Sequence, residues 1–208
     1  MTTSEPILVH TCCAPCLCAL LDALRAGGAA PTAFFFNPNI HPLIEYRRRL
    51  KAAQVLAERE RIPLVAAGGY GLQAFLAATA GQWGRPERCR ACYALRLDTA
   101  ARHAAANRFG RFTSTLLVSP QQDREAVVEL GHAAARRYGV AFDDSDRRAL
   151  HGLGIERARR IQLYRQQYCG CIFSEQERYE NTAVELHPPA GHGPRPRKPA
   201  ERDPEASQ

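Results

Sequence analysis

The stretch Ile7-Leu-Val-His-Thr-Cys-Cys-Ala-Pro-Cys-Leu-Cys18 runs from a short apolar segment into a dense group of cysteines. Apolar residues at helical spacing continue from there to Gly27. This order predicts a buried strand, a functional loop and a helix. In open α/β sheets, ligands bind beyond the carboxyl ends of the strands, where the following helix offers free N–H groups and a positive dipole end. We therefore expect Cys12, Cys13 and Cys16 at a binding site, with their thiolate forms favoured.

The rest of the chain repeats this alternation of strand and helix. Apolar runs bounded by turn residues predict further strands at 31–36, 62–66, 112–118 and 140–142. Helical spacing predicts helices at about 42–61, 89–107, 122–138 and 155–168, and a short helix after Gly71. The alternation predicts an α/β fold with a Rossmann-like (HUP-like), mostly parallel sheet flanked by helices, and a C-terminal helical part.

Length and composition fit one compact domain. The chain has 208 residues, of which 45% are hydrophobic, and a chain of this size buries a core without disulfide support. We expect residues 1–186 to form a single catalytic α/β domain that contains the metal site. Residues 187–208 are rich in proline and arginine and have too few apolar groups to offset the entropy of ordering. They are predicted to form a disordered tail.

Charge and hydropathy bear on the location and partners of the protein. The sequence has no secretory signal and no run of about 18 apolar residues, so we expect no membrane association. Eight cysteines without an export signal favour a cytoplasmic protein. The net charge is +7, and nearly all basic residues are arginine, which pairs with phosphate and stacks on bases. This composition favours a polyanionic partner such as RNA, although an arginine-rich surface can also reflect genome composition.

The eight cysteines fall into three short clusters. They are Cys12, Cys13, Cys16 and Cys18; Cys89 and Cys92; and Cys169 and Cys171. Thiolates that converge from distant segments are typical of a soft metal centre. The adjacent Cys12 and Cys13 cannot easily chelate one tetrahedral ion but can reach different irons, which favours an iron-sulfur cluster over zinc. Cys89 and Cys92 would complete the ligand set, since a helix start favours deprotonation. A structural zinc site and a disulfide scaffold are the alternatives.

The C-x-C motif Cys169-Gly-Cys171 suggests a redox-active pair of cysteines rather than metal ligands. A disulfide between its two sulfurs would close a strained ring that is easily reduced, and Gly170 supplies the backbone freedom for it. Such a pair could store two electrons next to a one-electron cluster. Alternatively, both cysteines are metal ligands or a reduced pair without a catalytic role. Among the polar residues, His10 at a strand end could donate protons near neutral pH, although structural hydrogen bonding explains it equally well.

Five segments form a specific combination of motifs. They read His10-Thr-Cys-Cys-Ala-Pro-Cys16, Phe36-Asn-Pro-Asn-Ile-His-Pro-Leu-Ile-Glu-Tyr46, Cys89-Arg-Ala-Cys-Tyr-Ala-Leu-Arg-Leu97, Phe112-Thr-Ser-Thr-Leu-Leu-Val-Ser-Pro120 and Tyr164-Arg-Gln-Gln-Tyr-Cys-Gly-Cys-Ile-Phe-Ser174. In this order, over about residues 7 to 175, they resemble the QueH-type epoxyqueuosine reductases. The combination of all five is highly specific, whereas each alone would be modest support.

This resemblance implies the two-electron reduction of epoxyqueuosine to queuosine, with loss of water, at the wobble position of a tRNA with a GUN anticodon. It implies a 4Fe-4S cluster held by Cys12, Cys13, Cys89 and Cys92, with an additional iron ion beside it and without cobalamin. It also implies an electron donor, which the sequence does not identify.

Motif positions carry further roles over from the family. The resemblance assigns Cys169 and Cys171 as a redox pair. Cys16 stands where some members carry Asp, so it is expected to be a ligand of the additional iron. His10 or Asp146 is expected to act as a ligand or proton carrier. Cys18 matches no family motif, and we expect it to pack within its helix.

Two other functions remain open. An iron-sulfur tRNA thiolation enzyme that uses an adenine nucleotide would need a glycine-rich phosphate loop after the first strand, where this chain has His10-Thr-Cys-Cys-Ala-Pro15. A zinc-dependent tRNA-binding protein would hold zinc in place of iron. Metal analysis of the purified protein separates the zinc protein from the iron enzymes.

Overall fold

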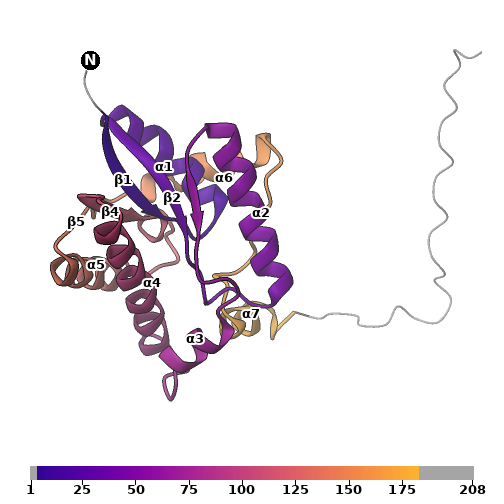
Figure 1. The fold of residues 1–208 in the computed structure, drawn as a ribbon. Helices are drawn as coiled ribbons and strands as arrows, with labels where there is room; N and C mark the ends of the chain where they lie inside the picture. Colours follow the sequence, from indigo (N-terminus) through magenta and orange to yellow (C-terminus); the bar gives the residue numbers. More distant parts are fainter. Residues whose placement is uncertain (1–3, 183–208) are drawn as a thin grey trace, which may run out of the picture.

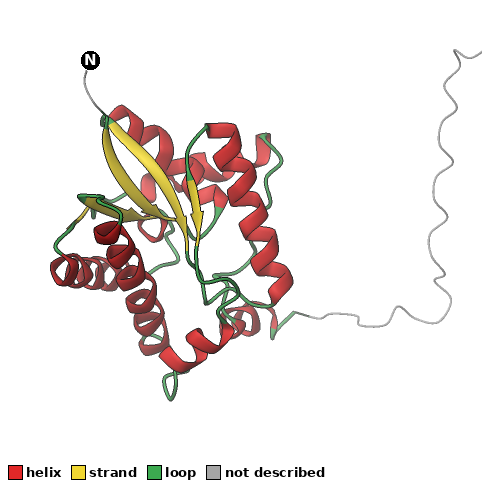
Figure 2. Cartoon of the chain, viewed as in Figure 1, coloured by secondary structure: helices red, strands yellow, loops and turns green. Residues whose placement is uncertain are grey.

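The computed structural model describes residues 4–182 and places one parallel sheet between two layers of helices (Figure 1, Figure 2). The strands are β1 (Glu5–His10), β2 (Ala29–Phe35), β3 (Leu64–Ala66), β4 (Arg111–Ser114) and β5 (Ala141–Phe142). Their order across the sheet is β3-β2-β1-β4-β5, and all neighbours pair in parallel. The predicted α/β class with a mostly parallel sheet is therefore confirmed.

Helices cover both faces of this sheet. The described helices are α1 (Ala14–Ala26), α2 (Leu43–Glu60), α3 (Leu72–Ala78), α4 (Glu87–Ala106), α5 (Arg124–Tyr138), α6 (His151–Arg160) and α7 (Ile172–Tyr179), with short 3-10 turns η1 (Thr115–Leu117) and η2 (Arg148–Leu150). One face packs against α1 and α2, with α6 packed on α1, and the other face packs against α4 and α5 (Figure 1).

The central strand β1 contributes to both hydrophobic cores. Ile7 and Val9 belong to the core under α1, α2 and α6, whereas Leu8 belongs to the core under α4 and α5. All three side chains are fully buried. Side chains alternate between the two faces of a strand, and burial of both faces requires a continuous apolar run, as this segment has.

Close packing of α6 on α1 holds the cysteine-bearing end of α1. Gly154 in α6 lies so near α1 that a Cβ at this position would be 2.5 Å from the carbonyl oxygen of Pro15. Pro15 lies in the first turn of α1, where its missing N–H costs no helical hydrogen bond. Arg157 of α6 extends the contact through an ion pair with Asp22 of α1 at 3.0 Å. The site-bearing helix is thus fixed from outside the sheet.

The strand predicted at 112–118 is shorter in the structure. β4 ends at Ser114 because the Ser114 hydroxyl accepts a hydrogen bond from the N–H of Leu116 at 3.1 Å and starts the turn η1. The turn brings Thr115, which follows the strand, to the end of β1. The early end of β4 therefore helps to build the site described below.

The helix predicted at 155–168 is wrong in its second half. α6 ends at Arg160, and Gln162 adopts a left-handed φ of 55°. The N–H of Leu163 then bonds to the carbonyl of Ala158 at 2.9 Å, which turns the chain back onto the core. Residues 161–171 form a loop, and the separate helix α7, which the sequence analysis did not predict, follows it.

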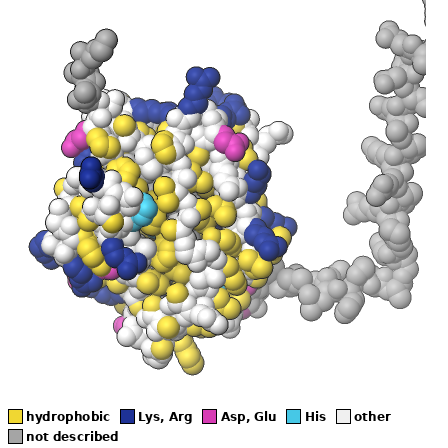
Figure 3. Space-filling model, viewed as in Figure 1, with side chains coloured by type: hydrophobic (Ala, Val, Ile, Leu, Met, Phe, Trp, Pro, Cys, Tyr) yellow, Lys and Arg dark blue, Asp and Glu magenta, His cyan; other side chains and the backbone are white. Residues whose placement is uncertain are grey.

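Some predictions concern the surface and the ends of the chain. The predicted tail, residues 187–208, lies outside the described residues. No helix within residues 4–182 is long and apolar enough to cross a membrane. On the face shown in Figure 3, Arg and Lys side chains lie mainly around the margin, and hydrophobic and uncharged atoms cover most of the middle.

Candidate functional site

The site lies beyond the carboxyl ends of β1 and β4, the two strands between which the sheet order reverses. This position is the usual ligand-binding crevice of open α/β sheets. The N–H of Cys12, two residues after β1, donates to the hydroxyl oxygen of Thr115, which follows β4, at 2.9 Å. The same hydroxyl lies 3.1 Å from the Cys12 sulfur. Thr115 therefore ties the first cysteine loop to the neighbouring strand.

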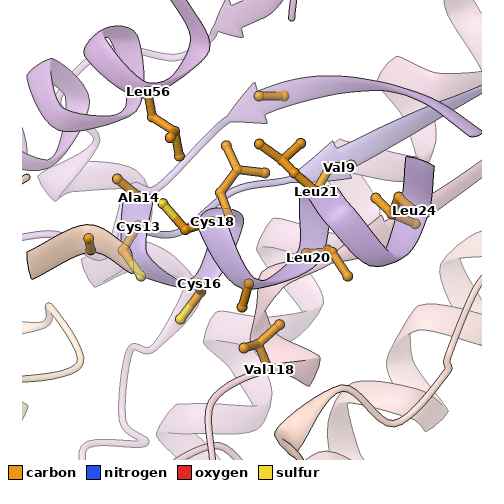
Figure 4. Packing of buried hydrophobic residues seen from close by; sticks show 14 of the residues in the cluster. Val9, Cys13, Ala14, Cys16, Cys18, Leu20, Leu21, Leu24, Leu56 and Val118 are labelled. Carbon is orange, nitrogen blue, oxygen red and sulfur yellow. The ribbon is translucent and has the colours of Figure 1, made fainter. Parts of the chain in front are cut away.

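Three sulfurs converge at the N-terminal end of α1. The Sγ atoms of Cys12, Cys13 and Cys16 all lie within 4.8 Å of one another, and those of Cys12 and Cys13 are 3.8 Å apart. Figure 4 shows the Cys13 and Cys16 sulfurs pointing to the same side, away from Leu56. Such a group could hold a soft metal ion or one corner of a larger cluster.

The same group does not favour three thiolates in the absence of a metal. Sulfur contacts with Cys13 and Cys16 lower the pKa of the Cys12 thiol, helped by the Thr115 hydroxyl. The contacts with Cys12 raise the pKa values of Cys13 and Cys16. The expectation that all three thiolates are favoured is therefore wrong for the metal-free protein, because close like charges in a buried site cannot all form.

A second group of sulfurs comes from α4 and the loop before α7. Cys89 and Cys92 lie in the first turns of α4, as expected, and Cys92 packs with Cys171 around Phe75. Burial raises the pKa of Cys89 and raises that of Cys92 to about 12. The predicted deprotonation at the helix start is therefore wrong for the metal-free thiols, since burial disfavours the charged thiolates.

One cavity of about 710 Å³ joins the three cysteine clusters. Its wall includes the first cluster through Cys12 and Cys16, the second through Cys89 and the third through Cys169. Polar side chains line it as well, namely Ser119, Gln121, Gln122, Gln166, Gln167 and Tyr168. Sulfur is the donor that iron-sulfur clusters require, so the donor set of this cavity fits such a group.

Arg96 is a buried cation beside the sulfurs. It lies on α4 one turn after Cys92, and its side chain lines the cavity although only 1% of the residue is exposed to solvent. Its Nη2 donates to Asn37 Oδ1 at 2.9 Å, and its Nη1 lies 3.9 Å from the Cys92 sulfur. Asn37 in turn donates to the carbonyl of Thr11 at 2.8 Å. The network links the guanidinium to the Cys12 loop.

Arg49 is a second buried cation, on α2, and it holds the C-x-C loop. Its Nη1 and Nη2 donate to the carbonyls of Cys169 and Tyr168 at 2.8 and 2.9 Å. Its Nε donates to Glu45 at 2.7 Å, and the hydroxyl of Tyr164 donates to the other oxygen of that carboxylate. The loop is thus anchored by a buried ion pair.

Gly170 allows the loop to approach this anchor. Its φ is 138°, in the region that favours glycine. A Cβ here would lie 3.1 Å from the amide nitrogen of Asn39 and 3.2 Å from Arg49 Nη1. Cys169 and Cys171, on either side, are free thiols.

Gln122 contacts the cavity end of the same loop. Its amide nitrogen lies 3.7 Å from the Cys169 sulfur, and its amide oxygen accepts a hydrogen bond from the hydroxyl of Tyr93 at 3.0 Å. The neutral, partly buried amide of Gln122 therefore orients the Cys169 thiol.

The remaining candidates from the sequence lie at different depths. His10 is fully buried, with Nδ1 2.8 Å from the Ser114 hydroxyl and Nε2 3.2 Å from the carbonyl of Phe36. Burial lowers its pKa to about 3, so the ring is neutral near pH 7. Asp146 is exposed, does not line the cavity and pairs with Arg148 at 2.6 Å. Hydrogen bonds from Arg148 lower the pKa of this carboxyl.

Cys18 is separate from the other sulfurs. It is buried in the core on the opposite side of α1, where Figure 4 shows its sulfur toward Leu56. Burial raises the pKa of its thiol to about 11. The expected packing role is confirmed by this position.

Sequence reasoning missed both buried arginines and Gln122. Arg96 and Arg49 each lie four residues after a residue of the recognised motifs, Cys92 and Glu45. On a helix this spacing places the two side chains on one face, and that signal could have identified both arginines.

Comparison with known proteins finds one matching family and several similar sequences. The family described as epoxyqueuosine reductase QueH matches residues 7–177. The epoxyqueuosine reductase QueH of Histophilus somni is 38% identical over 174 residues, 81% of this chain and 71% of the relative. That of Dehalococcoides mccartyi is 34% identical over 174 residues, 83% and 94% of the two chains. That of Thermotoga maritima is 31% identical over 194 residues, 89% and 98% of the two chains.

Proposed function

Because the chain belongs to the epoxyqueuosine reductase QueH family of oxidoreductases, we propose that it reduces epoxyqueuosine in tRNA to queuosine. The observation that carries this proposal is the cavity whose wall contains Cys12, Cys16, Cys89 and Cys169, with sulfurs from three distant segments. A redox reaction on a bulky substrate needs electron-carrying groups beside an open space, and this cavity supplies both.

The proposed substrate is the wobble nucleoside of a tRNA with a GUN anticodon. Reduction of its epoxide to an alkene releases the oxygen as water and consumes two electrons and two protons. The glutamine amides of the cavity offer donors and acceptors for the base and the hydroxyl groups. Arg85 and Arg178, which also line the cavity, offer charges for the flanking phosphates.

Cys12, Cys13, Cys89 and Cys92 are proposed to hold a 4Fe-4S cluster, and Cys16 an additional iron ion. When bound, these groups would supply electrons and a Lewis acid for the epoxide oxygen. The buried thiols must lose their protons on binding, so the affinity for metal should rise with pH.

Cys169 and Cys171 are proposed to be a two-electron reserve. Oxidation of the two thiols to one disulfide releases two electrons and two protons, the number that the reaction consumes. Gln122 and Arg49 orient Cys169, the less buried member, toward the cavity. An external electron donor would then reduce the disulfide again. Free thiols at every described cysteine agree with a reducing, cytoplasmic setting.

The roles predicted for His10 and Asp146 stay predictions. Both ring nitrogens of His10 already have partners inside the protein, which favours a positioning role for the end of β1. Asp146 would need to move from its exposed pair with Arg148 to reach the cavity. Neither contact supports direct proton transfer in the arrangement described.

The test is an anaerobic assay of the iron-reconstituted protein with dithionite and tRNA that contains epoxyqueuosine. Digestion and mass spectrometry of the nucleosides should reveal the loss of one oxygen from the modified base. Replacement of Cys89 by Ala should abolish this product together with the absorbance of the cluster, whereas Cys18→Ala should retain turnover.

Two results would contradict the proposal. Stoichiometric zinc in a colourless protein that leaves the nucleoside unchanged would favour a zinc-dependent tRNA-binding protein. Full multiple turnover by Cys169→Ala would remove the redox role from the C-x-C pair without affecting the assignment of the substrate.

A further inference from the structure

Arg96 has no carboxylate partner, although its guanidinium is buried. Within residues 4–182 no Asp or Glu forms an ion pair with it. Its Nε also has no hydrogen-bond partner. Among the described residues, the other two buried arginines do have a carboxylate partner, because Arg49 pairs with Glu45 and Arg88 pairs with Glu177. Arg96 is thus the unmatched member of three.

An unmatched buried charge is expensive. Removal of a guanidinium from water costs several kcal/mol, and neutral hydrogen bonds such as the one to Asn37 recover only part of this cost. Such a charge persists in a folded protein when an anion completes the site. The anion must therefore come from groups other than the carboxylates of the described chain.

The groups near Arg96 that can carry negative charge are sulfurs. The Cys92 sulfur is 3.9 Å from Nη1. Arg96 also lines the same cavity as Cys12, Cys16, Cys89 and Cys169. Cysteines of all three clusters therefore share one cavity wall with this guanidinium, and they become anionic when they bind a metal.

We propose that Arg96 is the counter-cation of the anionic sulfur centre, and that its charge promotes metal loading and favours the reduced state of the centre. This inference rests on the proposed function, in which a thiolate-bound cluster occupies the cavity. The Asn37 bridge to Thr11 keeps the guanidinium beside the Cys12 loop. Arg96 is a positioning residue, since it contacts cluster ligands rather than the reacting epoxide.

The test compares Arg96→Met with Arg49→Met, a matched control that also removes a buried cation from the cavity wall. Thermal unfolding is measured for the metal-free proteins and again after anaerobic loading with iron and sulfide. Iron and sulfide per chain are determined, and the reduction of the bound centre is followed optically at fixed potentials.

Arg96→Met should leave the melting temperature of the metal-free protein unchanged or higher, because an uncompensated charge has been removed. After loading, the same variant should melt below the wild type and contain less iron. At the potential where the wild-type centre is half reduced, its ratio of reduced to oxidised centre should fall about tenfold. Arg49→Met should melt lower in both states, since Glu45 is left buried and unpaired.

Two further variants, Arg96→Lys and Arg96→Gln, keep the proposal testable if Arg96→Met does not fold. Lys keeps the charge and should restore most of the iron content and the potential, whereas Gln keeps a donor for Asn37 but not the charge and should behave like Met. If Arg96→Met or Arg96→Gln melts as low as Arg49→Met without metal, and keeps the wild-type iron content and potential, Arg96 is only structural and the proposal is wrong.

The failure of this inference is distinguishable from failure of the proposed function. If the wild type binds iron but does not reduce epoxyqueuosine, the proposed reaction falls while the redox measurements still decide the role of Arg96. If the wild type binds no iron and sulfide, both proposals are wrong.

Discussion

Two buried arginines line the same cavity, but only one of them has a carboxylate partner. Arg49 and Arg96 are 2% and 1% exposed, and both line the cavity. On the Arg49 side, Glu45 balances the charge at 2.7 Å and the remaining donors hold backbone carbonyls. On the Arg96 side, the guanidinium meets an amide and a sulfur. The polypeptide alone balances the charge of Arg49, whereas the charge of Arg96 would be balanced by the anionic centre that we propose in the cavity.

The largest effect is expected when the sulfur beside Arg96 is removed. Cys92→Ala removes the sulfur nearest to Arg96 and one proposed ligand, so turnover should fall by more than about 100-fold and iron should be lost. Iron analysis and nucleoside mass spectrometry measure both quantities. The control is Cys18→Ala, which removes a buried thiol from the side of α1 that faces away from Cys16. This variant should keep both the iron and the turnover. Wild-type iron content in Cys92→Ala would contradict the ligand assignment.

The next largest effect is expected when the carboxylate partner of Arg49 is removed. Glu45→Gln leaves Arg49 buried without an anion, which should lower the free energy of unfolding by about 3–5 kcal/mol. Urea unfolding of the metal-free protein measures this change. The double variant Glu45→Gln, Arg49→Met should recover part of the loss, because no charge is then left unpaired. Equal losses in the single and double variants would mean that the ion pair itself does not carry the stability.

The pH dependence of unfolding of the metal-free protein tests the electrostatic effect of Arg96 on its buried neighbour His10. Burial, together with the charge of Arg96, lowers the pKa of His10 from 6.5 to about 3. Below pH 6.5 the unfolded chain binds a proton at this residue that the native protein does not. The contribution of neutral His10 to the free energy of unfolding is therefore fully present above pH 6.5. Between pH 6.5 and 3 this free energy should fall by about 1.4 kcal/mol for each pH unit that the pH drops.

The variant His10→Asn should flatten this dependence in urea unfolding experiments. His41, whose pKa burial also lowers, should keep part of the slope and serves as an internal reference. An unchanged slope in His10→Asn would show that His10 is protonated or accessible in the native protein.

The smallest effect concerns a pair outside both sides of the cavity. Asp146→Asn removes an exposed ion pair with Arg148, and exposed pairs contribute less than about 1 kcal/mol. Stability and turnover should both stay close to those of the wild type. A large loss of turnover at unchanged stability would instead support the proton-carrier role predicted from the sequence.

Much of the fold follows from patterns that depend on one segment at a time. The apolar run at 7–10, the cysteine loop and the following helix were recognisable because strand, turn and helix periods differ. The place of Cys89 and Cys92 at the start of α4 followed in the same way. The gathering of three clusters in one cavity could be expected because parallel strands end at the same edge of the sheet.

The rest depended on contacts between distant segments. Nothing local marks the end of α6 at Arg160, which is fixed when Leu163 turns back onto the core. The protonation of Cys89 and Cys92 depends on how deeply the finished fold buries them. The long-range partners of the two arginines also depend on tertiary packing, namely the carbonyls of Tyr168 and Cys169 for Arg49 and the amide of Asn37 for Arg96.

The bond between the Cys12 loop and Thr115 joins residues 103 positions apart, and the bond from Arg49 to Cys169 joins residues 120 positions apart. A nascent polypeptide on the ribosome possesses the first cysteines long before their distant partners have been translated. Contacts this remote form late, after the intervening elements have condensed. The cavity wall should therefore be completed only after the segments that carry Thr115 and Cys169 have folded onto the Cys12 loop and Arg49.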